Sequence, residues 1–139
     1  MRILGLDVGT KRIGVAMSDE LLLTAQGMQT LQRHALQGDL SEIKGMIENN
    51  NVSEVVVGLP LNMDGSYSAK TKEVVDFMDS LLKFVNVPVK TWDERLTTVQ
   101  AVRVLLEADM SRAKRKRLTD KLAAQIILQS YLDSKKKRE

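Results

Sequence analysis

Cysteine is absent from the sequence, and histidine occurs once, as His34. Disulfides, thiolate zinc sites and metal sites built from several histidines are therefore excluded. Aromatic residues make up only 4% of the chain, so base stacking on exposed rings is not expected to dominate any nucleic-acid binding. No apolar run approaches the ~20 residues of a membrane span, and Asp7 comes too early for a signal peptide. We expect a cytoplasmic protein that does not contact a membrane.

Charge is small in total but unevenly distributed. The net charge of the 139 residues is +3. Residues 1–110 carry 11 Lys or Arg and 15 Asp or Glu, whereas residues 111–139 carry 10 and 3. A basic end of this kind indicates a polyanionic partner, most simply nucleic acid, unless it is only a solvated helix and tail. The length and the 43% apolar content favour one domain over 1–139, with residues 135–139 as a flexible basic tail.

The patterns of apolar residues predict an α/β fold. Short apolar or β-branched runs predict a hairpin of strands at 3–8 and 13–18 and further strands near 28–31, at 54–59 and at 88–92. Helical spacing predicts helices from a capping box at Asp39, over 74–85, from a capping box at Thr97, and over about 119–132. A basic loop at 112–117 would precede the last helix. This order predicts a mixed central β-sheet with helices on both faces.

Acidic residues occur at three positions where they need an explanation. Asp7 lies in an apolar strand, on the face of Ile3 and Gly5 by alternation, unless it only caps the turn that follows. Asp93 and Glu94 follow the strand at 88–92, at the edge where α/β sheets bind ligands. Neighbouring side chains in a strand point to opposite faces, so only one of these two can face the first acid, and we favour Glu94.

The third acid, Asp120, opens the last predicted helix at the head of the apolar stripe formed by Ala123, Ala124, Ile127 and Tyr131. The simple alternative is that it only complements the helix dipole. Three carboxylates on one sheet face would repel one another unless a cation lies between them. A site with oxygen ligands alone suits Mg²⁺ or Mn²⁺, and two such ions ~4 Å apart can drive phosphodiester hydrolysis.

Four motifs, taken together and in this order, closely resemble the YqgF family, also called the RuvX or Holliday-junction-resolvase-like family. They are LDVGTKRIGVA at 6–16, VGLPLNMDG at 57–65, DERLTT at 93–98 and DKLAAQIIL at 120–128. The resemblance implies an RNase H-like fold and a metal-dependent nuclease with catalytic, metal-binding carboxylates at Asp7, Glu94 and Asp120. Such proteins are linked to maturation of the 5′ end of 16S rRNA from its precursor and, alternatively, to Holliday-junction cleavage.

One departure concerns the second acid. In the related RuvC resolvases this acid follows the fourth strand, where the present sequence has Gly58-Leu59-Pro60. The role would therefore pass to a residue after the next strand, Glu94 or, as its substitute, Asp93.

Basic residues close to the three acids are candidates for phosphate contacts. Lys11 and Arg12 follow the first acid directly, with a polar hairpin tip as the alternative. Arg95 follows the second, with an ion pair to Asp93 as the alternative. The predicted basic loop adjoins the third acid and supplies Arg112, Lys114, Arg115, Lys116 and Arg117. Recognition that relies on phosphates predicts binding that weakens sharply with salt.

Other functions compete with precursor-rRNA processing. The stretch Asp7-Val8-Gly9-Thr10 also resembles the first phosphate loop of actin-like ATPases and sugar kinases, but those enzymes close two domains around ATP. A non-catalytic RNA-binding role in ribosome assembly would survive Asp7→Asn. A junction resolvase should be a symmetric dimer, and no dimer seam is obvious. We expect a monomer or weak dimer that binds pre-16S rRNA or branched DNA, with the ribosomal small-subunit precursor as a further partner.

Overall fold

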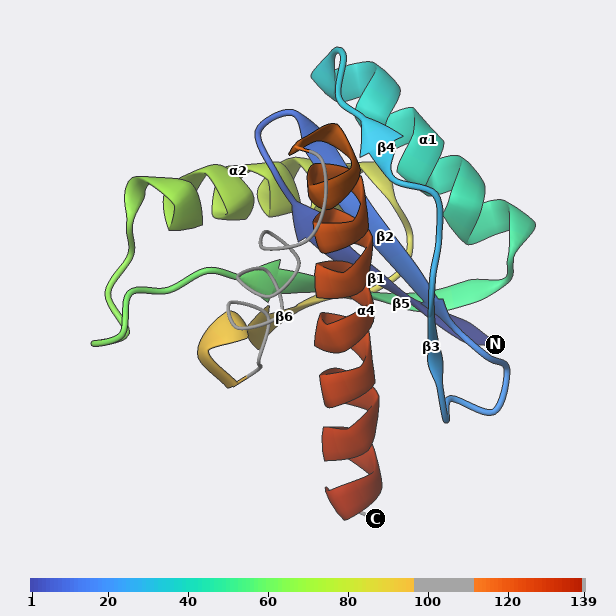
Figure 1. The fold of residues 1–139 in the computed structure, drawn as a ribbon. Coiled ribbons are helices and arrows are strands. Elements are labelled where there is room, and N and C mark those ends of the chain that lie inside the picture. The colour runs from blue at the N-terminus through green and yellow to red at the C-terminus, as the bar shows by residue number, and fades with distance from the viewer. Residues whose placement is uncertain (97–111, 139) are drawn as a thin grey trace.

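A mixed sheet forms the centre of the molecule in the computed structural model (Figure 1). The structure describes residues 1–96 and 112–138, with side chains in 1–96 and 122–136. Within these ranges the strands are β1 (Arg2–Val8), β2 (Arg12–Ser18), β3 (Ala25–Gly27), β4 (Leu31–Gln32), β5 (Val52–Leu59) and β6 (Val89–Asp93). The helices are α1 (Leu36–Asn49), α2 (Ala69–Phe84) and α4 (Arg112–Arg138), and Glu94–Leu96 forms one 3₁₀ turn.

The strands follow the order β3-β2-β1-β5-β6, and β4 also pairs with β2. β1 and β2 form the antiparallel hairpin expected from the sequence, with Leu6 opposite Val15. β5 is parallel to β1 and to β6. The carboxyl ends of β1, β5 and β6 therefore meet at one edge of the sheet, which is the edge where open α/β sheets bind ligands. The mixed sheet predicted from the sequence is confirmed.

Helices cover both faces of the sheet, as predicted (Figure 1). Side chains alternate along β1, so that Leu4, Leu6 and Val8 pack with α1 and α2, while Ile3 packs with α4. The first face carries the larger apolar cluster, to which α1 and α2 contribute Leu40, Ile43, Ile47, Val74, Phe77, Met78 and Leu81. We call the opposite side the α4 face.

Helix α4 lies very close to the sheet because small residues meet at the contact. Ala123 and Ala124 are fully buried, and a Cβ atom on Gly5 would come within 2.8 Å of the Leu128 Cβ. Two glutamines of α4 also bond to the backbone of β3: Gln125 Nε2 donates to the Ala25 carbonyl at 3.0 Å, and Gln129 Oε1 accepts the Ala25 N–H at 2.9 Å. The expectation that small alanines let this helix approach the sheet is confirmed.

A buried acid, Glu54 on β5, joins the carboxyl-terminal half of α4 to the sheet. Its carboxylate accepts the Tyr131 hydroxyl at 2.8 Å and pairs with Lys90 Nζ at 2.8 Å and Lys135 Nζ at 3.3 Å. Burial alone would raise the pKa of Glu54, but the bonds from Lys90 and Tyr131 and the charge of Lys135 outweigh it and lower that pKa. Burial, followed by the bond to Glu54, raises the pKa of Tyr131.

The extent of the last helix was predicted wrongly at both ends. Residues 112–117, expected as a basic loop, form the first turns of α4, and the expected tail is helical as far as Arg138. The reason is that Lys, Arg and Ala are good helix formers, and no Gly or Pro occurs between residues 112 and 138 to stop the helix.

Two further boundaries differ from the prediction. α1 begins at Leu36 rather than at Asp39, because the buried Asp39 carboxylate accepts the His34 N–H at 3.2 Å and so holds the segment before the helix. The single strand expected near 28–31 is divided into β3 and β4 on either side of residues 28–30. The capping box at Thr97 and the helix expected after it lie outside the described residues.

None of the helices in the described part of the chain combines the length and the apolar character that a membrane crossing requires.

Candidate functional site

Asp7 lies near the carboxyl end of β1, on the α4 face. Alternation along the strand places it on the side of Ile3, which packs with α4, and of Gly5, which Leu128 contacts. Its neighbour across the hairpin is Gly14, and its side chain is half-buried. Asp7 therefore faces the side of the sheet that the sequence predicted, and it lies at the edge where β1, β5 and β6 end.

The Glu94 carboxylate lies over Gly58 of β5. A Cβ atom at Gly58 would come within 2.8 Å of Glu94 Oε1 and 2.5 Å of Ile127 Cδ1. Ile127 belongs to α4, so the acid and the helix share one face of the sheet. Because Leu6 pairs with Val57, Gly58 is next to Asp7 along two neighbouring strands. The two acids therefore stand on one face of the sheet, at the carboxyl ends of β1 and β6, with Gly58 of β5 between them.

The sequence marks Gly58 only as a departure from the related resolvases, and the effect of its missing side chain on Glu94 was not predicted. Its missing side chain leaves the space that the Glu94 carboxylate enters from the turn after β6. A glycine in the middle of a β-branched run is the available signal, since such a glycine often marks a close approach by another group.

The backbone of Asp120 lies in α4, and its side chain is outside the described residues. Along this helix Tyr131 contacts Glu54, near the start of β5, and Ile127 contacts Gly58, near its end. Moving toward the amino end of α4 therefore leads toward the carboxyl edge of the sheet. The helix brings the Asp120 backbone to the side of the sheet where the other two acids stand.

The donors fit a hard cation by their chemistry. Asp7 and Glu94 offer only oxygen atoms, which is the ligand type that Mg²⁺ and Mn²⁺ prefer. Among the side chains that the structure describes, no three His, Cys, Asp or Glu residues form a group able to hold a metal ion. Two of the three predicted ligands belong to that part of the chain.

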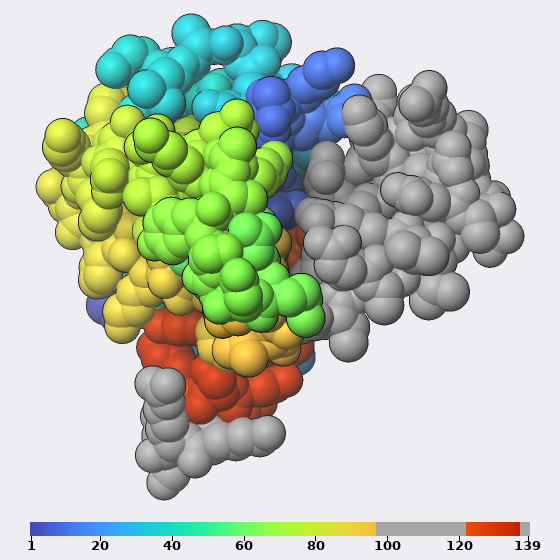
Figure 2. Space-filling model, turned by 90° about the vertical axis from the view of Figure 1, so that its left-hand side faces the viewer, coloured from blue at the N-terminus to red at the C-terminus, as the bar shows by residue number. Residues whose placement is uncertain are grey.

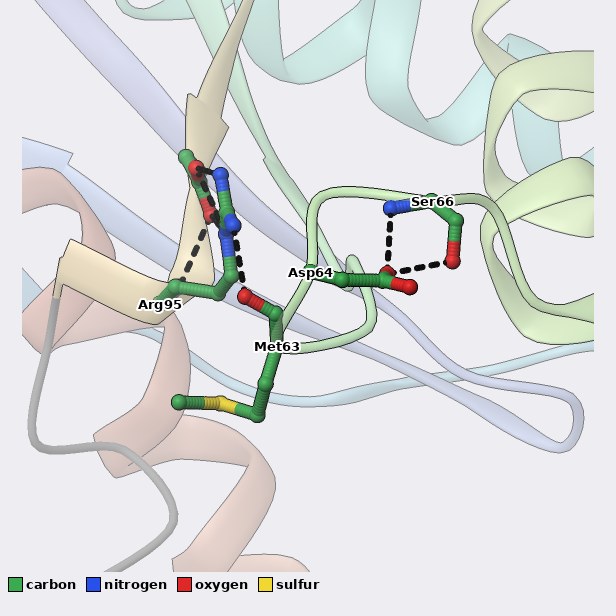
Figure 3. A network of polar contacts seen from close by, with 5 residues as sticks. Met63, Asp64, Ser66 and Arg95 are labelled. Carbon is green, nitrogen blue, oxygen red and sulfur yellow. Dashed lines mark hydrogen bonds and ion pairs between the residues drawn. The ribbon is translucent and has the colours of Figure 1, made fainter.

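The acid next to Glu94 in the sequence, Asp93, forms an ion pair with Arg95, the arginine labelled in Figure 3. Arg95 Nη2 and Nε donate to Asp93 Oδ2 at 2.7 and 3.0 Å, and the Arg95 backbone N–H donates to Oδ1 at 2.9 Å. The bond from Arg95 lowers the pKa of Asp93, and the same bond raises the pKa of Arg95. The two adjacent acids thus have different surroundings, one beside Gly58 and one in an ion pair.

Arg95 also holds the loop that follows β5. Its Nη1 donates to the Met63 carbonyl at 3.0 Å, while Asp64 Oδ1 accepts the N–H of Ser66 at 2.9 Å (Figure 3). The hydrogen bonds from Ser66 lower the pKa of Asp64. In Figure 2 this green loop lies directly against the orange turn of residues 94–96. The turn that carries Glu94 is therefore braced from the side by the loop.

The structure describes the side chains of only some of the basic residues that were predicted to contact phosphates. Arg12 begins β2 on the α4 face, and its Nε atom is buried without a hydrogen-bond partner among the described residues. Lys11 is exposed in the turn between β1 and β2. The basic residues of the 112–117 segment have helical backbone, and their side chains are outside the described part.

Comparison with known proteins identifies the family. The sequence model of the RuvX family, described as Holliday junction resolvase, matches residues 1–134. This chain belongs to the RuvX family. The resemblance noted in the four motifs is confirmed, and with it the expectation of a nuclease, that is, a hydrolase of phosphodiester bonds.

Curated RuvX relatives match this chain over nearly its whole length. A protein of Halothermothrix orenii is 54% identical over 137 residues, covering 99% of this chain and 98% of the relative. A protein of Clostridium acetobutylicum is 52% identical over 134 residues, covering 96% and 99%. Both carry the name "Putative pre-16S rRNA nuclease".

Solved structures share the fold of this RuvX chain at low identity. Thermus thermophilus RuvC, in complex with a Holliday junction substrate, superposes with a TM-score of 0.62 at 14% identity over 98% of this chain and 96% of that chain. A fowlpox virus resolvase in complex with Holliday junction DNA superposes with a TM-score of 0.59 at 14% identity over 96% and 98%. The predicted RNase H-like fold is confirmed.

Proposed function

We propose that this chain is a divalent-metal-dependent nuclease that processes the 5′ end of pre-16S rRNA in the cytoplasm. The observation that carries the proposal is the placement of the Glu94 carboxylate over Gly58, on the face and at the edge where Asp7 stands. The names of relatives with 54% and 52% identity support precursor rRNA as the substrate.

The proposed site holds its cation with Asp7, Glu94 and Asp120. A bound Mg²⁺ or Mn²⁺ would favour ionisation of a water molecule and neutralise charge on the phosphate. The chain itself fixes the direction of the carboxylates, since β1 and the 94–96 turn are both anchored in the sheet. In this proposal the guanidinium of Arg12, whose Nε has no hydrogen-bond partner among the described residues, donates to a phosphate oxygen of the substrate through its Nη atoms.

The remaining basic residues divide into two roles. We assign Lys11 and the 112–117 segment of α4 to the RNA backbone, because they flank the acidic edge at Asp7 and Asp120. Arg95 is assigned to holding the turn of Glu94, because its guanidinium already bonds to Asp93 and Met63. Recognition would then rest mainly on phosphates and shape, by a monomer or weak dimer.

The test is cleavage of precursor 16S rRNA by the pure protein with Mn²⁺, with Mg²⁺ and with chelator. Asp7→Asn and Glu94→Gln should each lower the cleavage rate by at least about 100-fold, because each removes a charged metal ligand. Both should keep the circular dichroism spectrum and the melting temperature of the wild type within a few degrees. Asp79→Asn, an exposed acid on α2, is the matched control and should cleave normally.

A four-way DNA junction should be tested in the same assay, because the family description and the structural neighbours are resolvases. Cleavage of the junction alone would transfer the proposal to junction resolution. Normal rRNA maturation in cells that carry only Asp7→Asn would instead favour a non-catalytic role in ribosome assembly and overturn the metal site.

A further inference from the structure

The turn between β1 and β2 carries the chain from Asp7 to the basic pair Lys11 and Arg12. It is closed on itself by the Gly9 N–H, which donates to the Arg12 carbonyl at 2.8 Å. Two carbonyls of the turn, those of Gly9 and Lys11, accept hydrogen bonds from outside the hairpin. The donors of those two bonds decide how firmly the residues after Asp7 are held.

Both donors belong to Arg33, which follows β4. Its Nη1 donates to the Gly9 carbonyl at 3.0 Å, and its backbone N–H donates to the Lys11 carbonyl at 2.9 Å. β4 already pairs with the start of β2, with Gln32 opposite Arg12. One arginine therefore fixes the turn at two points.

The Arg33 side chain is itself fixed by groups on the face opposite α4. Its Nε lies 3.4 Å from Oδ2 of Asp39, an acid only 5% exposed. Its guanidinium carbon stands 5.1 Å from the centre of the Phe77 ring of α2, a distance typical of a cation–π contact. A part-buried ion pair and a ring therefore hold the Arg33 side chain, which also reaches the Gly9 carbonyl.

We propose that Arg33, held by Asp39 and Phe77, is a positioning residue for the metal site. It sets the turn after Asp7 from the side of the sheet opposite the acids and so fixes both the carboxylate and the basic pair. The inference rests on the proposed function, because it concerns the geometry around Asp7. Arginine is required because its planar fork bonds to a carbonyl and a carboxylate together, whereas a lysine ammonium lacks that geometry.

The experiment compares Arg33→Lys with Arg2→Lys in the full chain. Arg2 is the matched control, since it lies at the other end of β1 and its ion pair with Glu20 is long, at 3.9 Å. A pocket of about 470 Å³ beside Arg33, Asp39 and Phe77 leaves room for the shorter side chain. Mn²⁺ affinity is measured by isothermal titration calorimetry, and amide exchange of residues 9–12 by mass spectrometry.

Arg33→Lys should weaken Mn²⁺ binding about tenfold, as substitutions behind metal ligands do. It should also speed amide exchange in the turn at residues 9–12, while the slowest amides of β5 exchange as before. Arg2→Lys should change neither quantity. If Arg33→Lys unfolds, Asp39→Asn is the second variant, and the same two changes are expected because it removes the charge that holds Arg33.

Wild-type metal affinity and wild-type exchange at the turn in a folded Arg33→Lys protein would overturn the inference. A fall in melting temperature with neither of these changes would also overturn it, since that result describes a purely structural residue. If the proposed metal site itself is wrong, the result is different: the Asp7→Asn protein would bind Mn²⁺ as tightly as the wild type does. Exchange at the turn reports on Arg33 whether or not a metal binds.

Discussion

Gly58 shows how one missing side chain can define a site. Gly58→Ala would place a Cβ atom 2.8 Å from Glu94 Oε1 and 2.5 Å from Ile127 Cδ1, and both neighbours would have to move. We expect the free energy of unfolding to fall by about 1–2 kcal/mol, as in overpacked cores. We expect the cleavage rate to fall about tenfold, because a displaced carboxylate is a misplaced ligand. Chemical denaturation and single-turnover kinetics measure the two effects.

Gly45→Ala is the matched control for that substitution. Gly45 lies within α1, and a Cβ atom there would have no neighbour within 4 Å. This variant should be more stable by about 0.5–1 kcal/mol, because alanine favours the helix, and should cleave normally. Unchanged cleavage by Gly58→Ala would mean that the reaction does not require the Glu94 carboxylate to lie over Gly58.

At the scale of single residues, alternation predicted the face of Asp7 correctly, because Leu4, Leu6 and Val8 make the opposite face of β1 apolar beside the larger core cluster. It could not decide between Asp93 and Glu94, since it states only that neighbours point opposite ways. In the structure Asp93 bonds to Arg95, and the Glu94 carboxylate lies over Gly58, which is why Glu94 is the residue that we propose. The role proposed for Arg33 left no trace in the sequence, because Gly9 lies 24 positions away from it along the chain.

At the scale of elements, the attachment of α4 to β5 should depend on pH. The pKa of Glu54 is lower in the folded chain than its ordinary value of 4.5. Its contribution to stability is therefore complete above that value and is lost as the pH falls through the lower, folded-state pKa. Thermal melting between pH 6 and pH 3 should show this loss. Glu54→Gln should flatten the acid slope, whereas Glu48→Gln, an exposed acid of α1, should leave it unchanged.

Tyr131→Phe tests the same attachment at neutral pH. The hydroxyl donates to a carboxylate in a buried position, at 2.8 Å. Its loss should lower the free energy of unfolding by about 1.5–2 kcal/mol, the range for a hydrogen bond to a charged group. A change below about 0.5 kcal/mol would show that Lys90 and Lys135 satisfy Glu54 without the tyrosine.

Strands were easier to predict than helix ends, for a physical reason. β1, β2 and β5 are apolar segments of seven or eight residues. Each is followed by a glycine, a proline or a polar turn, so the sequence itself shows where the strand ends. Charge clusters are usually solvated, and the basic residues at both ends of α4 were therefore predicted to form a loop and a tail rather than a helix. Charge and helix formation are nevertheless compatible, since lysine and arginine side chains reach water from a helical backbone.

At the scale of the whole molecule, the distribution of charge predicts how RNA binding depends on salt. Exchanging both Arg115 and Lys116 for alanine should flatten the plot of log affinity against log salt by roughly one unit for each phosphate that is no longer neutralised. Filter binding of a precursor-rRNA fragment at several potassium concentrations measures the slope. The matched control replaces Lys70 and Lys72, two exposed lysines of α2, and should leave the slope unchanged. Equal slopes for both double variants would mean that the amino-terminal turns of α4 do not meet RNA.

The contacts between α4 and the sheet join segments that the ribosome makes at very different times. Gln129 and Ala25 are 104 positions apart, and the helix that covers Ile3, Ala16 and Val56 follows every described strand in the sequence. The ribosome therefore makes all the described strands before it makes the helix that packs on their α4 face. A product shortened before α4 would lack Asp120 and would expose the apolar side chains that α4 covers, a surface prone to aggregation and readily recognised by chaperones and proteases.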